Sequence, residues 1–291
     1  MIKYLIPLLI FISCKSLPKE INTQIKFSKV ATLPSAINES SGLIVLDGQL
    51  ITHNDSGSDA VLYKIDSTGM ITDRVKYHNL YNIDWEGITQ SDKSIHIADI
   101  GNNRGNRKDL KIYNIHKAAL WQEETDQDLS NLSYAGQKDF TVRPQKHSYD
   151  AEAVLVIDEI MYLFSKDWIN FSTSIYSFPI YKDAVLNKHQ TIETKGLITD
   201  ATFNKENRVL LCGYNQSLAP FIIELRFDQG VFTFIKKVDL PIEGAQIEAI
   251  AYYGKDKNGS EIYYLTSEAV NVKLGDDEAK TDGELYKLIW E

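Results

Sequence analysis

The amino-acid sequence predicts an all-β fold, a five-bladed β-propeller with four-stranded blades. A motif recurs along the chain in which an oxygen-bearing residue precedes a small residue and an apolar run, aligned at Ser41, Glu86, Glu152, Asp200 and Glu248. Successive copies lie 45, 66, 48 and 48 residues apart, a spacing typical of repeated four-stranded units. The 291 residues include 16 Tyr and 11 Phe but only 7 Pro, which favours strands over linkers.

The N-terminal 24 residues are expected to lie outside the propeller. Lys3 precedes an apolar run over residues 4–12, which is too short to span a membrane but suits a signal peptide. The run ends in Phe-Ile-Ser-Cys14, which resembles the lipobox of bacterial lipoproteins. We therefore expect residues 1–14 to be a signal peptide, Cys14 to be lipidated and residues 15–24 to be a tether. The alternatives are an ordinary cleaved signal and a buried first strand.

Residues 25–291 are predicted to form a single propeller domain, with turn signals separating four short strands in each complete unit. The strands are expected at 42–46, 49–53, 61–65 and 71–77; at 88–90, 95–99, 110–115 and 139–143; at 154–157, 161–165, 174–181 and 191–195; at 201–204, 209–214, 221–227 and 231–240; and at 249–253, 262–266 and 285–290. In the second unit, residues 118–129 are predicted to form a short surface helix.

The last unit has only three predicted strands, and the strand predicted at 25–33 belongs to no unit. We expect this N-terminal strand to complete the last blade and so remove the open edge of the ring. The extra length of the second unit leaves a six-bladed ring as the alternative. No sixth acidic motif occurs between Leu120 and Tyr149, which favours five blades.

Acidic residues are predicted to meet at one end of the propeller axis, where the inner strands begin. Four carboxylates and a hydroxyl facing one axis would repel one another unless a cation lies among them. Oxygen ligands without His or Cys select Ca²⁺. We therefore predict a calcium site formed by Ser41, Glu86, Glu152, Asp200 and Glu248. For any single member, a bond to a strand end or to the next blade is the alternative.

The loops that follow the second strand of each unit are expected to open on the same face. Their amide and basic side chains are predicted to bind a small anionic ligand over the metal: Asn54, Asn102, Asn103, Arg104, Arg107, Lys166 and Asn215. A solvated loop is the alternative for the two arginines. The same loops supply three candidate general bases, Asp55, Asp99 and Glu268.

Other functions are disfavoured by composition and by the missing motifs. The net charge of −9 argues against a nucleic-acid partner, because phosphate binding requires a basic face. The six His residues are scattered through different units without metal-ligand spacing. The sequence contains no nucleophile elbow and no phosphate-binding loop.

Four short motifs resemble those of a family of exported bacterial propeller lipoproteins: Ser40–Leu43, Asn54–Gly57, Asp84–Glu86 and Asp99–Asn103. The chain is more distantly similar to the calcium-activated nucleotidases, five-bladed propellers whose axial Ca²⁺ is held by Ser and Glu of successive inner strands. It departs from their pattern at Asp200. The resemblance supports the metal more than it supports a reaction.

Two functions remain open at this stage. The first is a binding or scaffold lipoprotein of the bacterial cell envelope, anchored through Cys14 to a membrane, for which the outer membrane is expected. Its partner would be a small anion, a glycan or a protein. The alternative is a metal-dependent hydrolase of phosphate esters, phosphoanhydrides or lactones at the same central site.

Overall fold

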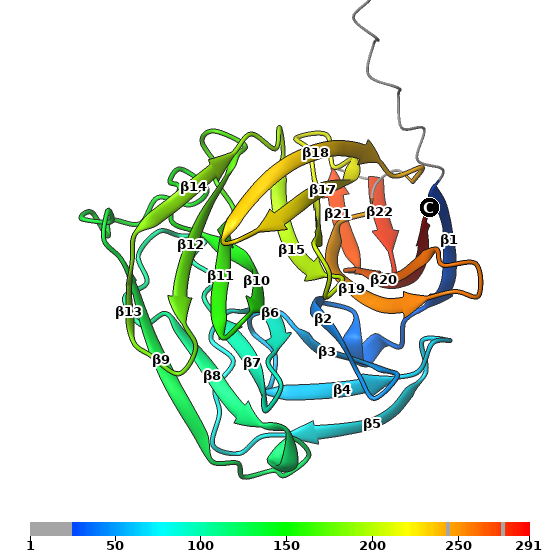
Figure 1. The fold of residues 1–291 in the computed structure, drawn as a ribbon, viewed down its shortest axis with the longest axis horizontal. Helices are drawn as coiled ribbons and strands as arrows, with labels where there is room; N and C mark the ends of the chain where they lie inside the picture. The colour runs from blue at the N-terminus through cyan, green and yellow to red at the C-terminus, as the bar shows by residue number, and fades with distance from the viewer. Residues whose placement is uncertain (1–24, 243–244, 275–276) are drawn as a thin grey trace, which may run out of the picture.

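A computed structural model describes residues 25–242, 245–274 and 277–291. Within these ranges five antiparallel sheets are arranged as blades around one axis (Figure 1). The five-bladed prediction is confirmed, and the six-bladed alternative is wrong. The predicted signal peptide, the lipobox residue Cys14 and the tether lie outside the described residues.

Each blade runs from an inner strand at the axis to an outer strand at the rim. Blade 1 contains β2 (Ser40–Leu46), β3 (Gln49–Asn54), β4 (Val61–Ile65) and β5 (Ile71–Lys76). Blade 2 contains β6 (Trp85–Gln90), β7 (Ser94–Asp99), β8 (Lys111–His116) and β9 (Gln127–Tyr134). Blade 3 contains β10 (Ala151–Ile157), β11 (Ile160–Ser165), β12 (Thr173–Pro179) and β14 (Lys188–Ile192).

The last two blades follow the same plan. Blade 4 contains β15 (Leu197–Phe203), β16 (Arg208–Tyr214), β17 (Pro220–Asp228) and β18 (Val231–Asp239). Blade 5 contains β19 (Ile247–Lys255), β20 (Glu261–Ser267), β23 (Glu284–Trp290) and the N-terminal β1 (Ile25–Thr32). A hairpin of β21 (Val270–Leu274) and β22 (Asp277–Thr281) separates β20 from β23.

The ring closes where the two ends of the propeller domain meet in blade 5. Strand β1 pairs antiparallel with β23, from Ile25 opposite Trp290 to Thr32 opposite Glu284 (Figure 1). The predicted closure by the N-terminal strand is therefore confirmed. It also joins the fourth strand to a blade that would otherwise end in an unpaired edge.

The outer part of blade 2 differs from the sequence prediction. The helix predicted at 118–129 is wrong, because only a 3₁₀ turn, η2 (Lys117–Ala119), precedes β9. The strand predicted at 139–143 is also wrong, since residues 135–149 form an irregular loop. The burial of Ser130, Leu132 and Tyr134 shows the alternation of a strand rather than the period of a helix. A short strand, β13 (Ala184–Leu186), adds in parallel to the outer edge of β9.

Apolar side chains fill the spaces between neighbouring blades. Trp85 is fully buried between blades 1 and 2, where the centroid of the His53 ring lies 5.6 Å away in an edge-on arrangement. Phe164 and Phe232 meet between blades 3 and 4 with their ring centroids 5.3 Å apart. These contacts fix each blade against the next, so the loops at the end of the axis have defined positions.

The inner strands present one backbone edge to the axis, and side chains of the adjacent blade complete their hydrogen bonds. The Ser41 hydroxyl donates to the Glu86 carbonyl at 2.8 Å, and the Thr202 hydroxyl accepts from the Tyr252 N–H at 2.9 Å. The glycines that follow the motif position in blades 1 and 2, Gly42 and Gly87, have a packing reason. A Cβ on Gly87 would lie 2.7 Å from the Glu152 carbonyl oxygen.

Candidate functional site

A polar cavity of about 170 Å³ lies at one end of the axis. Residues from all five blades contribute to it, and the lining contains five carboxylates and one lysine. The lining residues are Ser40, Ser41, Asp55, Glu86, Asn103, Gln145, Glu152, Lys166, Trp168, Tyr214, Gln246, Glu248 and Glu268. The structure thus brings together four of the five predicted metal ligands and four of the predicted loop residues.

A β-bulge at the start of each inner strand determines which side chain faces the cavity. The pairing register shifts at Ser41, Glu86, Glu152 and Glu248, so that each of these residues is the extra residue of its strand. Bulges re-aim a side chain without disrupting the rest of the ladder. In blade 4 the shift occurs at Thr199, one residue before the aligned Asp200.

Asp200 is consequently not brought to the cavity. Its side chain is fully buried, and its two carboxylate oxygens accept from the N–H groups of Ala201 at 2.8 Å and Ile250 at 2.9 Å. Burial raises the pKa of Asp200 well above its ordinary value. This carboxyl joins the inner strands of blades 4 and 5. The one-residue offset places it in the ladder rather than in the bulge.

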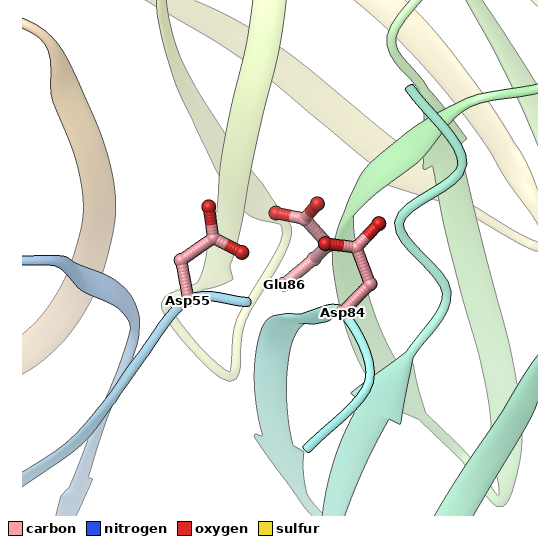
Figure 2. A group of neighbouring side chains, drawn as sticks. All are labelled: Asp55, Asp84 and Glu86. Carbon is pink, nitrogen blue, oxygen red and sulfur yellow. The ribbon is translucent and has the colours of Figure 1, made fainter. Parts of the chain in front are cut away.

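Three carboxylates form a cluster where blades 1 and 2 meet, and two of them, Asp55 and Glu86, line the cavity. One oxygen from each of Asp55, Asp84 and Glu86 lies within 4.8 Å of the other two (Figure 2). Asp55 follows β3, whereas Asp84 and Glu86 lie two residues apart at the start of β6. Asp84 is not among the predicted metal ligands. The two-residue spacing was the available signal, because alternate residues of extended chain point the same way.

The electrostatics of this cluster favour the binding of a cation. Burial, followed by the charge of Asp55, raises the pKa of Asp84 to about 7. Burial and the same neighbouring carboxylate also raise the pKa of Glu86 well above its ordinary value. Ionising each carboxyl therefore costs free energy, because the others are close to it. A cation placed among them would favour their ionised forms and so offset that cost.

Glu86 shows this most clearly. Its side chain is only 3% exposed, its carboxylate opens onto the axial cavity, and no hydrogen bond or ion pair of this carboxylate is found among the described residues. Gly101 leaves room for it, because a Cβ at this position would overlap the carboxylates of Glu86 and Asp84. A buried carboxylate without a partner carries a large desolvation cost, so this arrangement fits a cation.

The opposite side of the cavity carries its own cation. The Lys166 ammonium forms an ion pair with the Glu152 carboxylate, and both side chains are buried. The ammonium also lies 5.1 Å from the centroid of the Trp168 ring and 5.3 Å from that of Tyr214. Burial opposes the charge on Lys166, but Glu152, Tyr214, Glu248 and Glu86 together outweigh burial and raise the lysine pKa well above its ordinary value. Lys166 is therefore charged.

Glu248 and Glu268 complete the acidic lining from blade 5. Burial raises the pKa of Glu248 well above its ordinary value. Burial, followed by the charge of Asp55, raises the pKa of Glu268 to about 7. A carboxyl that titrates near neutral pH can accept or donate a proton under physiological conditions.

Asp99 and Arg107 lie beside the cavity but do not line it. Asp99 is fully buried. Its Oδ1 lies 2.8 Å from an Nη of Arg107. The same oxygen accepts a hydrogen bond from the Asp84 N–H at 3.1 Å. Arg107 also donates to the Gly101 carbonyl at 2.8 Å. This ion pair fixes the loop that carries Gly101 and Asn103. Asp99, predicted as a general base, lies outside the cavity lining and helps to position that loop through its Oδ1.

The other predicted loop residues are engaged outside the cavity lining. The Asn102 N–H donates to Asp150 at 2.7 Å, and the Asn54 amide donates to the Ala36 carbonyl at 2.9 Å. Asn215 caps its own turn by accepting from the Ala219 N–H at 3.0 Å. Arg104 is exposed to solvent. These four residues stabilise loops or face water rather than the cavity.

Several lining residues were not predicted as site residues. Gln145 reaches the cavity from the irregular loop at 135–149, and Gln246 lies just before β19. Gln145 occupies no repeated position, so no periodic signal could identify it. Gln246 stands two residues before Glu248, as Asp84 stands before Glu86, and this spacing was the available signal. Trp168 lies two residues after the predicted Lys166, but its ring gave no sign of facing the axis. In the described part of the chain, no helix is long and apolar enough to cross a membrane.

Comparisons with known proteins support the fold. No protein-family model matches the chain, and no curated protein matches its sequence. The PQQ-bound aldose sugar dehydrogenase of Streptomyces coelicolor is similar in structure, with 11% identity, 92% of this chain and 99% of that chain covered, and a TM-score of 0.51. At this identity the likeness shows the propeller fold alone.

Two further solved structures align over most of this chain. A proposed glucose dehydrogenase of Thermus thermophilus has 8% identity over 91% of this chain and 100% of its own, with a TM-score of 0.48. A proposed 6-phosphogluconolactonase of Bacteroides uniformis has 13% identity over 87% of this chain and 73% of its own, with a TM-score of 0.42.

Proposed function

We propose that the axial cavity binds a divalent cation, Ca²⁺ by its ligand type, and that this cation holds a small anionic ligand next to Lys166. The observation that carries the proposal is the buried and unpartnered carboxylate of Glu86, which faces Asp84 and Asp55 (Figure 2). Calcium binds through six to eight oxygens in flexible geometry. Carboxylates supply part of such a shell, and water or the ligand would supply the rest.

The donor set differs from the five-residue ring expected from the sequence. Asp55, Asp84 and Glu86 would hold the cation. Glu152 is already paired with Lys166, and Asp200 with backbone N–H groups. The similarity of the ring sequence to that of the calcium-activated nucleotidases supports a cation at this end of the axis, without assigning their reaction to this chain.

An anionic ligand could enter this cavity only if both the bound divalent cation and the Lys166 ammonium offset the charge of the carboxylates. The carboxylates of the lining repel an anion, and Lys166 is the only basic side chain among the described lining residues. A bound divalent cation would supply the missing positive charge, while the side-chain amides of Asn103, Gln145 and Gln246 would donate hydrogen bonds. We therefore assign the protein a cation-dependent binding function.

Hydrolysis of the bound ligand is the second candidate, and Glu268 is the observation that favours it. The substrate would be a phosphate ester, a phosphoanhydride or a lactone. A bound cation supplies a Lewis acid at the reacting oxygen. Glu268 lines the same cavity with a pKa of about 7, which suits a general base that removes a proton from water.

We place the protein in the bacterial cell envelope, anchored to the outer membrane through lipid on Cys14. The short apolar run and the lipobox-like Phe-Ile-Ser-Cys14 support this assignment. A tether of residues 15–24 would span at most about 36 Å when extended, so the propeller would stay close to the membrane surface. Incorporation of labelled palmitate should be lost in a Cys14→Ser variant; equal labelling would contradict lipidation.

Metal analysis tests the cation proposal, and a substrate screen separates the two functions. The protein beginning at residue 15 contains every blade, so it can be purified without the lipobox. We expect bound calcium, a lower melting temperature in chelator, and binding of inorganic phosphate that requires calcium. Turnover of p-nitrophenyl phosphate or of a lactone, lost in chelator and in Glu268→Gln, would establish the hydrolase. No metal and no chelator effect would contradict both functions.

A further inference from the structure

A second cavity, of about 540 Å³, opens between blades 2 and 3 and shares no lining residue with the axial cavity. Its walls come from the end of β9, the loop before β10, the loop after β11, and strands β12 and β14. The lining residues are Tyr134, Ala135, Gly136, Ser148, Tyr149, Asp167, Asn170, Ser174, Tyr176, Leu186, Asn187 and Lys188. A volume of this size suits a small organic ligand.

Three tyrosine rings form one wall of this interblade pocket. The Tyr134 ring centroid lies 5.4 Å from that of Tyr149 and 5.1 Å from that of Tyr176. Tyr134 and Tyr176 are buried, whereas Tyr149 is partly exposed and presents part of its ring to the pocket. Gly136 leaves space beside Tyr149, since a Cβ there would lie 3.0 Å from the Tyr149 hydroxyl.

One polar group in this wall has no partner. The Tyr134 side chain is only 5% exposed, and among the described residues its hydroxyl makes no hydrogen bond. Leaving such a buried hydroxyl unsatisfied is destabilising. A ligand or water hydroxyl at the inner wall would supply the missing hydrogen bond.

The opposite wall is polar but balanced in charge. The Asp167 carboxylate accepts from Ser148 at 2.8 Å and from the Asn170 amide at 2.9 Å, so it is already well satisfied. Lys188 is the only basic side chain among the lining residues and offsets this charge. Asn187 lies at the exposed edge. The pocket therefore offers amides and hydroxyls. It has no excess of positive or negative charge, so its lining does not favour a charged ligand.

We propose that this pocket binds a neutral sugar unit. A pyranose ring has apolar C–H faces that pack on aromatic rings and hydroxyls that bond to amides, which matches the two walls. The tyrosines supply rigid contact area, and the amides of Asn170 and Asn187 fix orientation. The inference is independent of the cation site, because the two cavities have separate linings.

Saturation-transfer NMR with methyl glycosides of glucose, galactose and N-acetylglucosamine tests the proposal on the protein beginning at residue 15. We expect saturation of at least one glycoside, strongest at its C–H protons. Tyr149→Ala removes the partly exposed ring and should weaken binding about tenfold, a loss of the size measured for aromatic contacts. Tyr149→Phe should retain most of the binding, since it keeps that ring.

Two further variants keep the result interpretable. Asn187→Ala changes an exposed side chain whose amide bonds only to the Val185 carbonyl, so the variant should fold and bind several-fold more weakly. Asn258→Ala removes an exposed amide of blade 5 that lines neither cavity, so it should leave glycoside binding unchanged. No saturation of any glycoside would overturn the proposal. Equal binding by the wild type, Tyr149→Ala and Asn187→Ala would also overturn it, because the sugar would then bind elsewhere.

Discussion

The two sides of the axial cavity use the same repeated backbone position in different ways. On the side of blades 1 and 2, Glu86 faces Asp84 and Asp55, and no basic side chain of the described residues forms an ion pair with it. On the side of blade 3, Glu152 is paired with Lys166. The bulge that presents Glu86 and Glu152 is the same in both blades, so the backbone repeat is preserved while the charge compensation is not.

The loop after the second strand makes the difference. Asp55 directly follows Asn54, which pairs with Ser40, and Lys166 directly follows Ser165, which pairs with Ala151. Asp55 and Lys166 therefore occupy equivalent places in blades 1 and 3, yet they carry opposite charges. On the side of blade 3, Lys166 supplies the positive charge from within the chain. On the side of blades 1 and 2, where Asp55 stands in place of the lysine, the carboxylates require a cation from solution. This contrast defines the proposed calcium site.

The largest expected effect comes from removing the internal cation. Lys166→Met leaves Glu152 buried without its partner, which should lower the free energy of unfolding by about 3–5 kcal/mol in chelator. Urea unfolding measures the loss. The double variant Lys166→Met with Glu152→Gln should recover most of it, because no buried charge remains. A single variant as stable as the wild type would show that the ion pair is not needed on this side.

Asp200→Ala tests whether blade 4 belongs to the cation site. The substitution leaves the N–H groups of Ala201 and Ile250 without their acceptor, so stability should fall by about 1–3 kcal/mol. Calcium affinity should be unchanged, since Asp200 lies outside the cluster of three carboxylates and both of its oxygens accept backbone N–H groups. Loss of calcium binding in a folded Asp200→Ala protein would restore Asp200 as a ligand.

Asp200 and Lys166 also show which features of the fold and the site are predictable from the sequence. The repeat, the strand order and the closure by β1 were predictable, because they depend on local alternation and turn residues. The one-residue shift at Thr199 was not, since Asp200 has the same flanking pattern as the true bulge residues. The pairing of Lys166 with Glu152 depends on which loops converge, and no linear pattern contains that information.

Asp84→Asn tests the cluster that blades 1 and 2 supply. Removing one carboxylate charge from three should weaken calcium binding at least tenfold, equivalent to about 1.4 kcal/mol. In chelator the same variant should be at least as stable as the wild type, because one repulsive charge is gone. Titration calorimetry measures the calcium affinity, and thermal unfolding measures the stability in chelator. Unchanged affinity would place the cation elsewhere in the cavity.

The pH dependence of stability should differ between calcium and chelator. Burial raises the pKa of Asp84 and Glu268 to about 7, so the stability that these groups contribute is complete below about pH 4 and is lost as pH rises through 7. Calcium should remove the part of this loss that arises from Asp84. His53 and His96, whose pKa values burial lowers to about 4, act in the opposite direction but equally in both conditions.

Urea unfolding at several values between about pH 5 and pH 8 measures this effect. The gap in unfolding free energy between calcium and chelator should widen as pH rises, because the carboxylates ionise and attract the cation more strongly. The histidine contribution cancels when the two conditions are compared at each pH. Parallel curves would show that these carboxyls do not hold the cation.

Calcium titration of metal-free protein tests the central claim most directly. After dialysis against chelator, calorimetry on the protein beginning at residue 15 should show one calcium ion bound per chain, and the melting temperature should rise with calcium. Binding should weaken in Asp84→Asn and persist in Asp200→Ala. Absence of binding heat, together with a melting temperature that calcium leaves unchanged, would contradict the account.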